Sequence, residues 1–325
     1  MDQQYAPSAP PLNEQSFDVV RLQRFKQICA EHEINDEFAN RLRNLEGYQI
    51  IIVADDSGSM NEMLREPLGS NGQQQSRWDE LKKTVKIIVD IAAVLDRDGI
   101  DVHFLNRGSY TNVMHQGHLE TPFSTRAAGS TPILKILDPI FAQHGEQKRL
   151  IIIATDGVPD THRGRDGPSA LRHALEYERG PNDHVTIIAC TDDDDTMEYL
   201  DGWDKQIPRL DVVDDYASEK AQIKRIQGSK FLFSFGDYVA KAMMGPIDLW
   251  FDQLDEVKIT PSEASYHNTT YPTTVDMPGY VNATHVQPSY IEPTNVPRDI
   301  DPPPMPKANA MPIKKKKRNK TCVIS

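Results

Sequence analysis

Residues 48–59 read YQIIIVADDSGS and join a strongly apolar segment directly to a run of oxygen-bearing side chains. The first part, residues 48–54, is a continuous apolar run rich in β-branched residues, which is typical of a strand buried on both faces. Residues 149–155 (RLIIIAT) and 184–191 (HVTIIACT) have the same character. The stretch therefore predicts an inner strand of a parallel sheet that ends in a polar loop.

Segments with helical periodicity lie between the strand-like runs. Apolar residues recur at helical spacing over residues 78–95, 131–144, 169–179, 217–227 and 235–254. Shorter strands are predicted over residues 101–105, 109–115 and 210–213, the last at an edge of the sheet. Strands that alternate with helices predict an α/β fold with a doubly wound, mostly parallel, Rossmann-like sheet and helices on both of its faces.

Composition divides the chain into five parts. We predict a disordered Pro-rich arm over residues 1–16 and a disordered Pro/Thr-rich linker over residues 255–313. Residues 17–45 predict a helical extension of two short helices that meet near Asn35 and Asp36, a good helix start. The α/β domain covers residues 46–254, and residues 314–325 form a basic tail.

Charge and cysteine content restrict the class of protein. The formal net charge is −12, and because residues 306–325 carry seven cations and no acid, the rest of the chain carries −19. An acidic body argues against nucleic-acid binding, which needs a basic surface. Cys29, Cys190 and Cys322 form no disulfide framework, and no N-terminal signal or apolar run of about 18 residues is present. These features predict a cytoplasmic protein.

Oxygen-bearing side chains follow three segments of the predicted sheet. Asp55, Ser57 and Ser59 place one carboxylate and two hydroxyls at alternate positions after a strand, where doubly wound sheets bind ligands. Thr131 and Asp156 offer a third hydroxyl and a second carboxylate in later loops. Mg²⁺ prefers about six oxygen ligands in near-octahedral geometry. Asp55, Ser57 and Ser59 can therefore converge on one hard cation such as Mg²⁺ or Mn²⁺, and the two later loops offer further oxygens.

The D-x-S-x-S…T…D set, on strands in this order, resembles the metal-ion-dependent adhesion site of von Willebrand factor A (vWA) domains. The resemblance covers residues 48–254 and is similar in style to intracellular copine-type vWA domains. It implies that Ser57, Ser59 and Thr131 bind the cation directly, and that Asp55 and Asp156 bind it directly or through water. It also implies that the cation takes an acidic group of a partner protein as its last ligand, without bond chemistry.

Each part of this pattern has a simpler interpretation. Ser and Asp after a strand often cap the next helix, and Asp-Gly at positions 156–157 is also a turn signal. The acidic run at residues 192–195 (DDDD) could bind Ca²⁺, but such runs are more often solvated loops. The polar insert at residues 61–77, beside the predicted site, is a candidate lid or partner-contact loop.

The C-terminus carries a lipidation signal. Residues 322–325 (CVIS) form a C-a-a-X box, with Cys322 as the modified residue and a final Ser that favours farnesyl. A single lipid chain binds membranes reversibly, so a second signal is needed. Six basic residues supply attraction to an anionic membrane: Lys314, Lys315, Lys316, Lys317, Arg318 and Lys320. We predict peripheral attachment to the cytosolic face of a membrane; a nuclear localisation signal or a solvated tail is the alternative.

We therefore predict a non-enzymatic, metal-dependent protein-binding module. The first alternative is a metal-dependent phosphatase or hydrolase with Asp55 as nucleophile and His162 as the nearest histidine, although no P-loop, G-x-S-x-G or H-E-x-x-H motif is present. The second is a membrane scaffold that acts through its Pro-rich arms. Residues Pro7 to Pro10 (PSAP) resemble a motif bound by the ESCRT-I complex, but the simpler interpretation is a Pro-rich tail.

Overall fold

The computed structural model describes residues 12–65, 74–96, 98–143, 145–200 and 202–259, which all belong to one compact unit. The N-terminal half of the described chain contains α1 (Leu12–Glu31), α2 (Asp36–Leu42), η1 (Arg43–Leu45), β1 (Gln49–Ala54), η2 (Gly58–Asn61), α3 (Arg77–Leu95), β2 (Ile100–Phe104), β3 (Gly108–Val113), η3 (Gln116–Leu119), α4 (Glu120–Phe123) and α5 (Ile133–Phe141). The C-terminal half contains β4 (Arg149–Thr155), α6 (Gly167–His173), η4 (Ala174–Glu178), β5 (Asp183–Ala189), α7 (Asp194–Met197), η5 (Glu198–Leu200), α8 (Trp203–Gln206), β6 (Leu210–Val213), α9 (Tyr216–Gln227), α10 (Phe235–Met244), α11 (Leu249–Asp252) and η6 (Gln253–Asp255).

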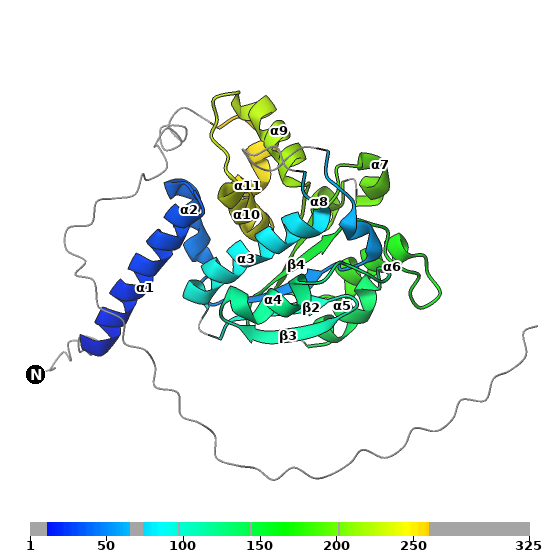
Figure 1. Ribbon diagram of the computed structural model, residues 1–325, viewed down its shortest axis with the longest axis horizontal. Helices are drawn as coiled ribbons and strands as arrows, with labels where there is room; N and C mark the ends of the chain where they lie inside the picture. The colour runs from blue at the N-terminus through cyan, green and yellow to red at the C-terminus, as the bar shows by residue number, and fades with distance from the viewer. Residues whose placement is uncertain (1–11, 66–73, 97, 144, 201, 260–325) are drawn as a thin grey trace, which may run out of the picture. The chain divides into compact units, whose positions relative to one another are not determined.

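The strands form one six-stranded sheet in the order β3-β2-β1-β4-β5-β6. Figure 1 labels β2, β3 and β4 among them. All neighbouring pairs are parallel except β2 and β3, which are antiparallel. The chain runs outward from β1 to β2 on one side and returns to β4 on the other. The order therefore reverses between β1 and β4, which is where ligand sites occur in such sheets. The predicted doubly wound, mostly parallel α/β fold is confirmed.

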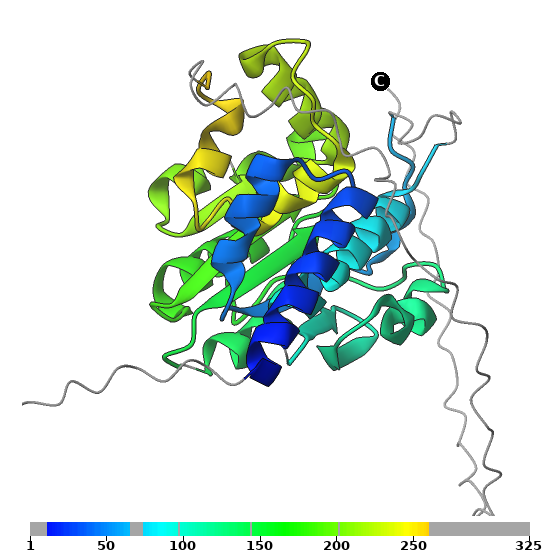
Figure 2. The same cartoon turned by 90° about the vertical axis from the view of Figure 1, so that its left-hand side faces the viewer.

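Helices cover both faces of the sheet, as Figure 2 shows. In β1, Ile50 and Ile52 join the core cluster that contains residues of α3 and α10, whereas Ile51 and Val53 join the cluster that contains residues of α5 and α6. Successive side chains of a strand point to opposite faces, so a strand covered on both sides is apolar at every position. This two-sided burial explains the continuous apolar runs of the sequence.

The N-terminal extension packs on one side of this sandwich. The guanidinium of Arg21 in α1 donates to the carbonyl of Val94 in α3 at 2.9 and 3.1 Å. Asn35 caps α2, as its position between the two helices predicted. However, α1 begins at Leu12 rather than at residue 17, so the prediction of disorder was wrong for residues 12–16.

The predicted final helix over residues 235–254 was wrong in length. The structure has α10, a break at Gly245 and Pro246, and then the short α11. Proline cannot donate a helical hydrogen bond and clashes with the preceding turn. Gly245 is also required by packing, because a Cβ there would lie 1.7 Å from Oδ2 of Asp211. Similarly, the predicted helix over residues 169–179 consists of α6 and the wider turn η4.

The folded part extends past the predicted boundary at residue 254. The N–H of Ile259 donates to Oε1 of Gln227 at 2.9 Å, so the first residues assigned to the linker contact the domain. The predicted motif at Pro7 to Pro10, residues 260–313 of the linker, the basic tail and Cys322 lie outside the described residues. Across the described part of the chain, no helix is both long and apolar enough to cross a bilayer.

Candidate metal site at the carboxyl ends of β1 and β4

The register of β1 and β4 positions the predicted site. These parallel neighbours pair Ala54 with Ala154, and the N–H of Asp55 donates to the carbonyl of Ala154 at 2.9 Å. The loops that follow the two strands therefore start side by side. As a result, the Asp55–Ser59 loop and Asp156 meet at the carboxyl ends of the two central strands, as the sequence predicted.

Four of the five predicted ligands are linked by short contacts. Oγ of Ser57 lies 3.0 Å from Oγ of Ser59, which donates to Oδ1 of Asp156 at 2.8 Å. The N–H of Ser57 donates to Oδ1 of Asp55 at 2.8 Å. Adjacent oxygen ligands of an octahedral Mg²⁺ are separated by about 3.0 Å, since each lies roughly 2.1 Å from the ion. The spacing and the all-oxygen chemistry of this set both fit a hard divalent cation.

The candidate site contains few charged side chains. In the described ranges, no group of three or more His, Cys, Asp or Glu side chains could hold a metal ion. The predicted set has only two carboxylates, so it depends on hydroxyl oxygens for the remaining positions. Because Arg77 pairs with Asp156, the two carboxylates and Arg77 together carry about −1, so a divalent cation bound there would leave a positive charge that attracts an additional anionic ligand.

Asp55 is completely buried, and both of its oxygens accept hydrogen bonds. Oδ1 accepts from the N–H of Ser57 at 2.8 Å, and Oδ2 accepts from the hydroxyl of Thr155 at 2.6 Å. Burial raises the pKa of Asp55 to about 6, the hydrogen bonds from Thr155 and Ser57 oppose this increase, and the charge of Asp156 adds to it. A carboxylate held in this way can orient a loop and a metal-bound water, but it is poorly exposed for nucleophilic attack.

Thr131 belongs to a third loop that packs against the first. The N–H of Gly58 donates to the carbonyl of Gly129 at 3.2 Å, and the carbonyl of Thr131 accepts from the N–H of Asp160 at 2.9 Å. Gly129 has a φ of +132°, and a Cβ there would lie 2.2 Å from the side chain of Asn106. The loop is therefore fixed beside the site. The hydrogen bonds recorded for Thr131 in the described part of the chain come from its backbone, and none of them links its hydroxyl to the other four predicted ligands.

Arg77 is the principal site residue that the sequence did not reveal. Its Nη1 lies 2.9 Å from Oδ2 of Asp156 and 3.1 Å from Oε2 of Glu62, and its side chain is 8% exposed. Its buried Nε has no partner among the described residues. The two oxygens of Asp156 are thus divided between Ser59 and Arg77. In the sequence, Arg77 was the last residue of a polar insert, and nothing in the pattern indicated its burial.

The ends of the insert at residues 61–77 pair with each other. The N–H of Leu64 donates to the carbonyl of Gln75 at 2.9 Å, and that of Arg77 donates to Glu62 at 3.0 Å. The N–H of Arg65 donates to Oδ2 of Asp192 at 2.9 Å. The first residue of the acidic run therefore anchors the insert. Residues 66–73, where a lid or partner contact was predicted, lie outside the described ranges.

Neighbouring polar residues have structural roles. Asp56, next to Asp55, is completely buried and accepts from the N–H of Asn106 at 2.8 Å and from Nε of Arg107 at 2.7 Å. It therefore anchors the turn between β2 and β3. Nε2 of His162 lies 3.0 Å from Oδ2 of Asp138 in α5. This contact occupies the histidine that the hydrolase hypothesis named.

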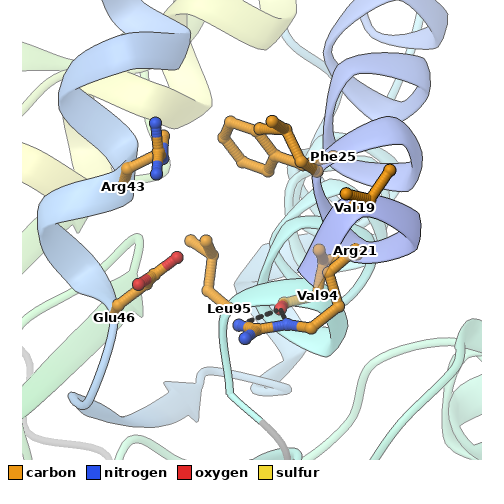
Figure 3. A pocket seen from close by; sticks show the side chains of 8 residues that line it. Val19, Arg21, Phe25, Arg43, Glu46, Val94 and Leu95 are labelled. Carbon is orange, nitrogen blue, oxygen red and sulfur yellow. Dashed lines mark hydrogen bonds between the residues drawn. The ribbon is translucent and has the colours of Figure 1, made fainter. Parts of the chain in front are cut away.

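A cavity of about 330 Å³ lies between α1, η1 and the end of α3 (Figure 3). Apolar side chains of Val19, Phe25 and Leu95 line it together with Arg43 and Glu46. Leu95 is the last residue of α3 and Arg77 the first, so about 27 Å of helix separate the cavity from the metal site. This cavity is not part of the candidate site.

Comparisons with known proteins give weak similarities. No protein-family model and no curated protein matches the sequence. The PilB minor pilin of Streptococcus sanguinis is 14% identical over 54% of this chain, with a TM-score of 0.38. An aspartate-to-alanine mutant of the same pilin is 12% identical over 64% of this chain, with a TM-score of 0.36. The chain spans 60% and 62% of the two pilin chains. An uncharacterised membrane-spanning protein of Vibrio fischeri is 16% identical over 55% of this chain and 95% of its own, with a TM-score of 0.19. These values carry no argument about family or function.

Proposed function

We propose that this protein is a non-enzymatic binding module that uses a divalent cation, Mg²⁺ or Mn²⁺, to capture an acidic side chain of an intracellular partner protein. The observation that carries the proposal is the contact between Ser59 and Asp156, with Ser57 and Asp55 beside them. It joins a D-x-S-x-S loop to the end of the neighbouring parallel strand, as the resemblance to vWA domains implies. Thr131 completes the proposed ligand set.

The surroundings of the site support a protein partner. Val158 follows the Asp156-Gly157 turn directly, and its side chain is 51% exposed. Met63, at the base of the insert, is also 51% exposed. Exposed apolar side chains near a polar centre are common in protein interfaces, where they lose water on binding. The cation would bind the carboxylate of the partner, and these side chains would contact the residues around it.

We further propose that the chain is attached to the cytosolic face of a membrane by farnesylation of Cys322. The support comes from the sequence alone: the terminal C-a-a-X box and the six basic residues before it. One prenyl chain and one basic cluster together provide the two signals that stable attachment needs. The partner would then be an acidic segment close to an anionic membrane.

The metal role is tested by affinity capture from cells that express the full chain, with and without EDTA. The variants are Asp55→Ala with Asp156→Ala, and Asp204→Ala in α8 as a control outside the proposed ligand set. We expect a set of proteins that is lost with EDTA and with the double variant but kept by the control. Capture that resists both treatments would disprove the metal role.

The membrane role is tested separately with Cys322→Ser. This variant is expected to leave the membrane fraction while it keeps its EDTA-sensitive partners in solution. Equal membrane association of Cys322→Ser and wild type would exclude the lipid anchor without affecting the metal proposal.

A further inference from the structure

A second cavity of about 330 Å³ opens between α3, α9 and the segment that joins α9 to α10. Its lining combines aromatic and basic side chains, with Glu33 as the acidic member. The basic members are Lys83, Lys220 and Lys224, and the aromatic members are Tyr216, Phe231, Phe233 and Phe235. Three ammonium groups and one carboxylate give the lining a charge of about +2 at neutral pH, although the chain without its basic tail is strongly acidic.

Two of the lysines contact neutral groups. Nζ of Lys83 lies 3.9 Å from the ring centre of Phe235, and Nζ of Lys220 donates to the hydroxyl of Tyr216 at 2.7 Å. Burial lowers the pKa of both lysines; the charges of Glu80 and Glu33 oppose that decrease at Lys83, and the charge of Glu33 opposes it at Lys220. Their ammonium groups have therefore lost part of their water, and the contacts recorded for them are with neutral groups.

These lysines differ from the structural lysine of the same region. Lys241 is almost completely buried and forms an ion pair with Glu219 at 3.1 Å. In contrast, the ion pairs that the structure records among its described residues include none with Lys83, Lys220 or Lys224. Positive charges that serve stability are normally paired where they lose water. The three pocket lysines thus place positive charge on the wall of a cavity.

The size and charge of the cavity select a ligand class. Its volume is at the small end of the range for small-molecule sites, so it suits a compact group better than a peptide segment. A phosphomonoester carries about −1.5 to −2 charges at neutral pH, which matches the lining, whereas a single carboxylate would leave one positive charge unbalanced. Lysine binds phosphate well as a point charge.

We propose that this pocket binds a phosphomonoester through Lys83, Lys220 and Lys224. The aromatic wall would contact the carbon skeleton that carries the phosphate. Lys83 lies six residues after Arg77 on α3, about 9 Å along the helix axis. The pocket is therefore separate from the metal site, and this proposal does not depend on metal binding. A soluble phosphomonoester and a lipid headgroup share this chemistry, and two arms of the experiment separate them.

The first arm measures binding of glycerol 3-phosphate to the full chain by calorimetry, with glycerol as the uncharged control. Removing two positive charges in Lys220→Gln with Lys224→Gln should weaken binding at least about tenfold. Lys220→Arg with Lys224→Arg keeps the charges and should restore binding, and Glu33→Gln should strengthen it. Lys135→Gln with Lys148→Gln is the matched control away from the pocket and should bind as wild type. Equal melting temperatures exclude unfolding as the cause.

The second arm measures co-sedimentation with phosphatidylcholine vesicles that contain either phosphatidic acid, a lipid phosphomonoester, or phosphatidylserine at equal surface charge. The basic tail is present throughout, so only the difference between wild type and Lys220→Gln with Lys224→Gln reports the pocket. A selective loss of binding to phosphatidic acid supports the proposal with a lipid as the source. Loss of glycerol 3-phosphate binding alone supports it with a soluble source. The proposal is overturned if neither probe binds saturably, or if the double Gln variant binds both as well as the control does.

Discussion

Ser59 and Asp156 are 97 positions apart in the sequence, yet Oγ of Ser59 donates a hydrogen bond to Oδ1 of Asp156 at 2.8 Å. This contact joins the loops that follow two neighbouring parallel strands. On its other oxygen, Asp156 accepts from Arg77. One buried carboxylate thus connects β1, β4 and α3, so the occupancy of the site should affect the stability of the whole domain.

Ser59→Ala is expected to remove most of the stabilisation by Mg²⁺. A ligand at 100 times its Kd stabilises the folded state by about 2.7 kcal/mol, and the variant loses both a proposed ligand and the hydrogen bond to Asp156. The measurement is the melting temperature of wild type and variant with Mg²⁺ and with EDTA. Ser229→Ala, at an exposed position, should keep the full response. An unchanged Mg²⁺ response in Ser59→Ala would contradict the assignment of Ser59.

Arg77→Met is expected to destabilise the metal-free protein more than the Mg²⁺-loaded one. Removing one partner of a buried ion pair costs about 3–5 kcal/mol, because Asp156 is left as an unpaired buried charge. A bound cation would neutralise the same carboxylate and so reduce this loss. Urea unfolding with and without Mg²⁺ measures both values. Arg163→Met, whose pair with Asp138 is 61% exposed on the arginine side, should cost less than about 1 kcal/mol. An equal loss for Arg77→Met in both conditions would contradict metal binding beside Asp156.

Lys241→Met is expected to destabilise the domain by about 3–5 kcal/mol, independently of Mg²⁺. Lys241 is 1% exposed, and its Nζ lies 3.1 Å from Oε1 of Glu219 and 3.6 Å from Oδ1 of Asp255. The variant leaves the Glu219 carboxylate buried without its cation. Adding Glu219→Leu should restore part of the stability, since it removes that uncompensated charge. Urea unfolding tests this, and a double variant no more stable than Lys241→Met would contradict the pairing.

Glu80→Gln is expected to make the stability less dependent on pH. Burial raises the pKa of Glu80 to about 7, Asp215 and Asp192 add to this increase, and the N–H of Tyr216 and the charge of Lys83 oppose it. Because the folded pKa exceeds the ordinary value of 4.5, protonated Glu80 stabilises the fold at low pH. That stability is lost as the pH rises from about 4.5 through 7, by roughly 3 kcal/mol in total.

The measurement is the free energy of unfolding of wild type and Glu80→Gln at several values between pH 5 and 8. Gln stays neutral, so the variant should lose less stability than wild type as the pH rises. Tyr216 can still donate to Oε1 of the new side chain, as it does to Glu80 at 3.0 Å. Parallel pH profiles for the two proteins would refute the role of Glu80.

The strands and their order in the chain were largely predictable from the sequence. Residues 149–155 and 210–213 form strands with the predicted bounds. The first was recognisable because a strand buried on both faces is apolar along its middle. The helix break at Gly245 and Pro246 was also visible in the sequence but was overlooked, because the apolar spacing continues across it. The start of α1 was missed because its first turn is polar.

The candidate site also has a part that the sequence predicted and a part that it did not. Asp55, Ser57 and Ser59 share one loop, and Asp156 follows a recognisable strand. The sequence by itself therefore determined which oxygen donors lie together at the carboxyl end of the sheet. Only the tertiary structure decided that Thr155 holds Asp55, that Arg77 takes one oxygen of Asp156 and that Lys83 faces the cavity beside α9. Those contacts depend on how a helix lies on the sheet and how two strands are aligned. Hydrophobic spacing determines which face of a helix is buried, but not which polar side chain meets which carboxylate.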